Sequence, residues 1–170
     1  MAESLKDPCK PAGYVFPEDV NDDGSAVRND RQKLKSARKN PWYVLATIYG
    51  EHEVGTSWLE WDQETVTKNR RAWNGWACTG MTNERRAQLA KDMEIDPAEL
   101  RDLSETETVE IVGVFRKRLR DKTAELPMPQ KSIDFTETYF ENPAGFKDYV
   151  FFRTSSFQSA TFSGPAYFWN

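Results

Sequence analysis

The chain has 170 residues, which is enough for one ordinary domain or two very small ones, and it carries a formal net charge of -4 with a pI near 5.2. This charge argues against a protein that holds nucleic acid by general electrostatic attraction, and no apolar run approaches the ~20 residues of a membrane-spanning helix. The N-terminus lacks the apolar stretch of a secretory signal, and the distant Cys9 and Cys78 do not suggest a disulfide framework, so we expect a cytoplasmic protein.

Residues 1–40 are rich in Pro, Asp, Asn, Lys and Arg and poor in large apolar side chains. Such a segment buries too little surface to offset the entropy lost on ordering, so we expect it to be disordered or a linker. Its basic stretch, residues 31–39, is expected to be a solvated part of that linker.

Within this segment, residues 19–30 fit the D-x-N-x-D-G pattern of a calcium loop with an acid at the twelfth position. The candidate oxygen ligands are Asp19, Asn21, Asp23 and Asp30. No helical pattern flanks the loop, its eighth position holds Ala26 rather than a large aliphatic residue, and no second loop pairs with it. The alternatives are a weak calcium site and a turn-rich acidic linker, and we favour the linker.

The composition changes at Pro41, and residues 41–126 are expected to form a small, mainly α domain. Its first apolar run, residues 42–49, fits a buried strand as well as a short helix, because it is only eight residues long. Three later segments have helical spacing and capping signals, and a short helix is expected from Asp96-Pro97. These segments are residues 64–79, 82–94 and 104–123.

The polar and aromatic residues of this domain give no catalytic pattern. His52 is the only histidine, and no second His or paired Cys supports a transition-metal site. The tryptophans at 58, 61, 73 and 76 are expected to be core residues, because so small a domain needs large side chains. No nucleotide-binding or nucleophile-elbow motif is present, so we expect no enzyme, no catalytic residues and no cofactor.

Residues 131–170 have a different pattern, in which phenylalanine recurs every five or six residues. The seven members of this column are Phe135, Phe140, Phe146, Phe152, Phe157, Phe162 and Phe168. A small or β-branched residue stands two positions before each of them, and a polar residue or Gly two positions after. Because a narrow interior accepts one large and one small side chain per side, the columns predict a four-sided tube with the phenylalanines stacked inside it.

These columns resemble the pentapeptide-repeat family, whose unit is A-(D/N)-(L/F)-X-X. The best match is residues 160–164, followed by 133–137 and 144–148, and residues 40–51 and 68–74 are similar to the leader that precedes the repeats in some bacterial members. The resemblance implies an α+β chain: a small, mainly helical N-terminal domain, then a short right-handed quadrilateral β-helix of fewer than two coils at residues 131–170.

The expected solenoid is short for this family, and Asn170 follows Phe168 and Trp169 with no capping element. An open solenoid end presents unpaired backbone and apolar surface. We therefore expect either a fragment of a longer repeat protein or an end-to-end dimer.

The leading functional hypothesis is a non-enzymatic scaffold that binds an unidentified protein partner, with no direct nucleic-acid or membrane partner. Two alternatives remain open: a DNA-mimic modulator of a topoisomerase, which the resemblance implies, and a calcium-binding module at residues 19–30. Residues 131–170 contain four acidic and three basic side chains, and this weak charge disfavours mimicry.

Overall fold

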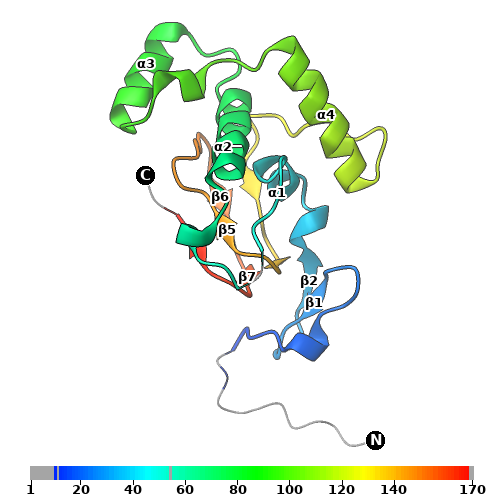
Figure 1. Cartoon of the computed structure of the whole chain (residues 1–170). Coiled ribbons are helices and arrows are strands. Elements are labelled where there is room, and N and C mark those ends of the chain that lie inside the picture. Colours follow the sequence, from blue (N-terminus) through cyan, green and yellow to red (C-terminus); the bar gives the residue numbers. More distant parts are fainter. Residues whose placement is uncertain (1–9, 11, 54, 169–170) are drawn as a thin grey trace, which may run out of the picture.

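The computed structural model of the chain describes residues 10, 12–53 and 55–168, which form an α+β fold (Figure 1). The α-helices are α1 (Pro41–Ala46), α2 (Gln63–Ala77), α3 (Asn83–Asp92) and α4 (Glu105–Leu119). The short 3-10 helices are η1 (Pro17–Asp19), η2 (Ala37–Lys39), η3 (Trp58–Glu60) and η4 (Pro97–Leu100). The strands are β1 (Ala26–Val27), β2 (Lys33–Ser36), β3 (Ile133–Asp134), β4 (Thr138–Phe140), β5 (Ala144–Gly145), β6 (Ser155–Ser156), β7 (Thr161–Phe162) and β8 (Ala166–Tyr167).

Helix α1 resolves the ambiguous apolar run. The side chain of Asn40 accepts a hydrogen bond from the Trp42 backbone N–H, and Pro41 occupies the first turn, so the chain has both signals of a helix start. Every residue of α1 from Trp42 to Ala46 is buried. A helix that is apolar on all sides has no stripe for periodicity to detect, which explains why the sequence left this run undecided.

Helix α4 begins and ends at local signals. The predicted capping box is present: Ser104 Oγ accepts from Glu107 N–H at 3.2 Å, and Glu107 Oε2 accepts from Ser104 N–H at 2.7 Å. At the other end, Arg120 adopts the left-handed conformation with φ 55 and its N–H reaches back into the last turn. The helix therefore ends at Leu119, a few residues before the predicted end.

Within the described residues, the strands form one mixed sheet and two small parallel pairs. The mixed sheet has the order β1-β2-β4-β7; β1 and β2 are antiparallel, whereas β2–β4 and β4–β7 are parallel. The parallel pairs are β3–β6 and β5–β8. These short strands curl around one another beneath α2 (Figure 1).

The predicted quadrilateral β-helix is wrong. Four of the strands form a curled mixed sheet that includes an antiparallel hairpin from the N-terminal segment, and residues 149–153 contain no strand. The backbone of Val150 is instead bonded to α2: its N–H donates to Asn74 Oδ1 at 2.9 Å, and its carbonyl accepts from Trp73 Nε1 at 2.9 Å. This stretch of backbone meets its hydrogen-bonding needs at a helix and not in a ladder, so a four-sided tube does not form.

The helical segment and the C-terminal strands share one hydrophobic core. Trp73 and Phe115 from the helices are fully buried in the same cluster as Phe135 and Phe140 from the strand region. Side chains of α2 also reach the strand region, because Asn74 Nδ2 donates to the Asp148 carbonyl at 3.0 Å. The helices are therefore packed directly against the curled sheet.

The segment expected to be disordered or a linker has strands of its own. Residues 33–36 of the basic stretch form β2, which pairs antiparallel with β1 and parallel with β4. Leu34 and Ser36 are buried while Lys33 and Lys35 are exposed, which is the alternation of a half-buried strand. Composition concealed this strand, because only one of its four residues is apolar.

Candidate functional site

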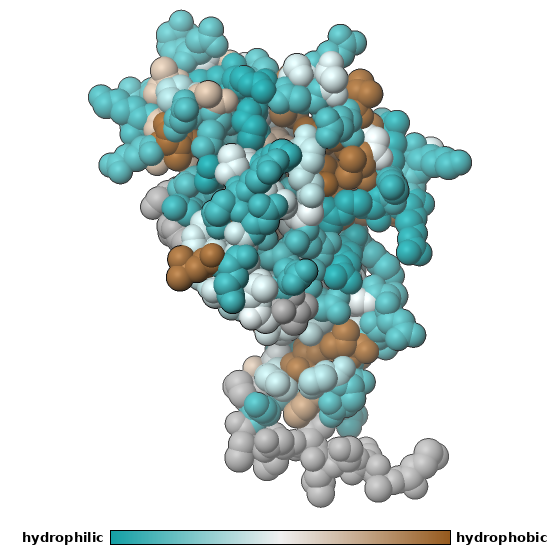
Figure 2. All heavy atoms as spheres, viewed as in Figure 1, coloured by the Kyte–Doolittle hydropathy of each residue, from teal (hydrophilic) through white to brown (hydrophobic). Residues whose placement is uncertain are grey.

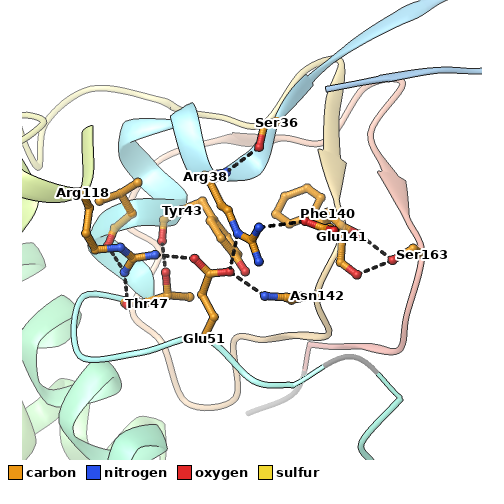
Figure 3. Close-up of polar contacts among 11 residues, drawn as sticks. Ser36, Arg38, Tyr43, Thr47, Glu51, Arg118, Phe140, Glu141, Asn142 and Ser163 are labelled. Carbon is orange, nitrogen blue, oxygen red and sulfur yellow. Dashed lines mark hydrogen bonds and ion pairs between the residues drawn. The ribbon is translucent and has the colours of Figure 1, made fainter. Parts of the chain in front are cut away.

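The carboxylate of Glu51 is bonded to side chains from three separate parts of the chain (Figure 3). Its Oε1 lies 2.6 Å from Arg118 Nη2, and its Oε2 lies 3.1 Å from Arg38 Nε and 2.6 Å from Asn142 Nδ2. Arg38 also contacts Glu141 at 2.9 Å. We call Glu51, Arg38, Arg118, Asn142 and Tyr43 the Glu51 cluster.

The Glu51 cluster joins parts of the chain that are far apart in sequence. Arg38 lies on η2, Tyr43 on α1 and Arg118 on α4, while Asn142 follows β4. Arg118 also donates to the carbonyls of Thr47 and Val44, at the end of α1. One carboxylate therefore holds the N-terminal segment, two helices and the strand region together.

Burial sets the electrostatics of this cluster. It raises the pKa of the Tyr43 hydroxyl well above its usual range, and the nearby Glu51 carboxylate adds to the effect, so Tyr43 stays neutral. Burial has the largest single effect on Arg38 and lowers its pKa, but the hydrogen bond to Glu51 and the negative charges of Glu51 and Glu141 together outweigh it, so the pKa is raised. The opposite charges of this cluster lie in contact and anchor the elements that carry them.

An aromatic cluster lies beside this anchor. The His52 ring stacks on Trp61 with centroids 3.7 Å apart, and Trp58 lies 5.1 Å from Trp61. Burial lowers the pKa of His52 to about 4, against a smaller opposing effect of Asp62 and Glu51. His52 is therefore neutral at physiological pH and packs as an aromatic ring.

The four tryptophans singled out in the sequence occupy two places. Trp73 is fully buried and Trp76 nearly so, in the main core. Trp61 is 5% exposed and Trp58 half-buried, and both pack outside the curled sheet against Tyr167.

The calcium-loop candidates do not converge on one point. The Asp23 carboxylate contacts Lys39 Nζ at 2.6 Å and accepts from Ser25, and Asp30 contacts Arg28 at 2.6 Å. Asn21 donates to the Ser25 hydroxyl. Among the residues that the structure describes, no group of three or more His, Cys, Asp or Glu side chains is placed to hold a metal ion.

The phenylalanine column divides into stacked pairs. Phe135 stacks on Phe157, Phe140 on Phe162 and Phe146 on Phe168, with centroid distances of 4.8, 4.3 and 5.1 Å. The first member of each pair is buried, and the second is partly or largely exposed. Phe152 is 39% exposed and lies outside this series of pairs, in the stretch that follows the bonds to α2.

Sequence reasoning missed the Glu51 cluster. Arg38 lies in the stretch expected to be a solvated linker, and the partners of Glu51 lie 13 to 91 residues away along the chain. No local spacing links these residues. Only the pairing of β2 with β4 and the packing of α4 on α1 bring them together.

Comparison of the chain with family models, with curated proteins and with solved structures found no match. In the part of the chain that the structure describes, none of the helices has the length and apolar character needed to cross a membrane.

Proposed function

We propose that the protein is a non-enzymatic, cytoplasmic scaffold that binds a protein partner along the open edge formed by β6, β7 and β8. The observation that carries this proposal is that, within the described residues, each of these strands is paired on one side only. An unpaired strand edge is a template to which an extended segment of another chain can add.

The parallel register indicates which backbone groups face the open edge. The carbonyls of Thr154 and Ser156 accept hydrogen bonds from the β3 side, so the backbone groups of Ser155, which alternate with them, point away from β3. On β7, Ser163 N–H donates to the Phe140 carbonyl of β4, so the backbone groups of the preceding Phe162 point away from β4. On β8, the carbonyls on either side of Ala166 accept hydrogen bonds from the β5 side, so the backbone groups of Ala166 point away from β5. These three residues would pair with an added strand.

The side chains at this edge also favour a protein partner. Phe168 is 49% exposed, and Phe157 and Phe162 are half-buried although each stacks on a buried ring. Exposed aromatic residues are enriched at protein–protein interfaces. The Ser155 hydroxyl is buried and has no hydrogen-bond partner among the described residues, which leaves one polar group for a partner to satisfy.

The competing hypotheses have less support. DNA mimicry needs an extended acidic rod, and a curled mixed sheet is not one. The carboxylates of the calcium-loop candidates Asp23 and Asp30 are engaged by Lys39 and Arg28. A cytoplasmic location agrees with Cys78, a free and buried thiol.

The proposal is tested by affinity capture with the purified protein and the variant Ala166→Pro. Proline removes an N–H that faces the open edge and leaves the bond between Ala144 N–H and the Pro165 carbonyl in place. We expect a defined protein, identified by mass spectrometry and then purified, to bind the original chain and to bind Ala166→Pro at least about tenfold more weakly in calorimetry.

The matched control is Phe152→Ala, which changes an exposed aromatic residue away from the edge strands. It should bind the partner as the original chain does. A partner bound equally by the original chain and by Ala166→Pro would contradict the proposal, as would a partner lost equally with both variants. Sedimentation velocity on the same samples shows whether the partner is a second copy, in which case Ala166→Pro is monomeric.

A further inference from the structure

A groove of about 730 Å³ lies along the hairpin, between β1–β2 and the start of α1, and extends to Thr136 and Thr138. Its size falls within the range of about 300–1,000 Å³ of small-molecule sites. The residues that line the groove include none from β6, β7 or β8, so its lining differs from the open edge. Figure 2 shows hydrophobic atoms exposed over this hairpin, surrounded by hydrophilic ones.

Apolar side chains line part of the groove. Val27 contributes from β1, and Pro41 and Trp42 contribute from the first turn of α1. Trp42 is held in place by an edge-to-face contact with Trp76, at 5.8 Å between ring centroids. These residues provide a preformed surface for an apolar ligand body.

The rim of the groove is cationic. Lys33 and Lys35 project from the same exposed face of β2, and neither forms an ion pair with a carboxylate among the described residues. The third lysine, Lys39, is paired with Asp23 at 2.6 Å. The remaining acid, Asp134, accepts a hydrogen bond from Thr136 N–H at 2.8 Å. Three lysines against two aspartates leave one net positive charge on a chain whose total is -4.

We propose that this groove is a binding site for small amphiphilic anions, in which the apolar walls take a hydrocarbon or aromatic body and Lys33 and Lys35 take its carboxylate. The complementarity of charge and shape sets the ligand class. An uncharged molecule with the same body would bind more weakly. Added salt would lower the affinity for the anion, because it screens exposed charges.

The probes are decanoate and decanol, measured by isothermal titration calorimetry on the full chain below the concentration at which either forms micelles. We expect decanoate to bind with one-to-one stoichiometry and more tightly than decanol. Reversing both rim charges in the double variant Lys33→Glu/Lys35→Glu should lower the affinity for decanoate by about tenfold or more and leave the affinity for decanol unchanged.

Two further variants make the test decisive. The control double variant Lys122→Glu/Lys131→Glu makes the same charge change at exposed lysines outside the groove and should bind decanoate as the original chain does. Val27→Trp fills the groove from β1 and should abolish binding of both probes, while circular dichroism verifies that the chain is folded. Absence of decanoate binding, equal weakening by both double variants, or binding that survives Val27→Trp would overturn the proposal.

Discussion

Gly145 shows how closely the aromatic cluster is fitted to the curled sheet. A Cβ atom at this position would lie 2.4 Å from Trp61 Cζ3 and 3.0 Å from Cη2. Contacts under 3.0 Å force one group to move, and the Trp61 ring is itself sandwiched against His52. The absence of a side chain at position 145 is therefore what lets the indole lie against β5.

We predict that Gly145→Ala lowers the free energy of unfolding by about 1–3 kcal/mol, the usual cost of overpacking. The control is Gly113→Ala, in the middle of α4, where a Cβ would meet no atom within 4 Å. That change should stabilise the chain by up to about 1 kcal/mol, because alanine favours a helix. Urea unfolding of both variants measures the difference, and two variants of equal stability would refute the explanation.

The stacked His52 gives stability a pH dependence of predictable sign. Burial lowers the pKa of His52 from its ordinary value of 6.5 to about 4, so between these values the unfolded chain takes up a proton that the folded chain excludes. This contribution to stability is complete above pH 6.5 and is lost as the pH falls towards 4. We expect Tm to fall less over this interval in His52→Gln than in the original chain, measured by calorimetry; parallel curves would show that His52 does not titrate this way.

At the scale of elements, the Glu51 cluster links η2, α1, α4 and the strand region. The Glu51 side chain is only 16% exposed, and both oxygens are engaged. Removing the Glu51 charge takes away the ion-pair partner of Arg118, whereas Arg38 keeps Glu141 at 2.9 Å.

We predict that Glu51→Gln destabilises the chain by about 2–4 kcal/mol, because the guanidinium groups of Arg38 and Arg118 lose their shared carboxylate. The control is Glu64→Gln, which removes an exposed carboxylate paired with Lys68 and should change stability by less than about 0.5 kcal/mol. Chemical denaturation of the two variants tests the ranking. Equal effects would mean that the cluster is a surface network without an anchoring role.

Elements with local signals were the predictable ones. The capping box at Ser104 and the Asp96-Pro97 pair each lie within a few consecutive residues, so the sequence alone predicts where α4 and η4 begin. The two-residue strands carry no periodicity of their own, and only their pairing across the chain defines them. Long-range contacts also create the Glu51 cluster, which is why local reasoning missed it.

The spacing of the phenylalanine column correctly predicts interior positions for its first members, but the four-sided tube that it suggested is wrong. Phe135, Phe140 and Phe146 are buried in the core, but the backbone of Val150 is bonded to α2 and not to a strand: its carbonyl accepts from Trp73 Nε1, and its N–H donates to Asn74 Oδ1. A repeat pattern describes which residues prefer the interior. It does not describe a helix that competes for the same backbone groups.

For the whole molecule, the sheet order predicts a gradient of local stability. Strand β4 is paired on both sides, by β2 and β7, whereas β7 is paired on one side within the described residues. We expect the hydrogen-bonded amides of β4 to exchange with deuterium at least about tenfold more slowly than those of β7, because edges open more readily than sheet interiors. Mass spectrometry of peptides covering 138–140 and 161–163 measures this, and equal rates would show that the two strands open as one unit.

Three of the four parallel pairings share a single offset: Ile133 lies opposite Ser155, Tyr139 opposite Thr161 and Ala144 opposite Ala166, each 22 residues further along. The stretch between Phe146 and Ser155 lies between the two members of each of these pairings, so it is the one connection that all three ladders share. A slip of one position in these ladders would turn each paired side chain to the opposite face. A label or fusion is better tolerated at Gly80, which is exposed between α2 and α3 and has open space around it.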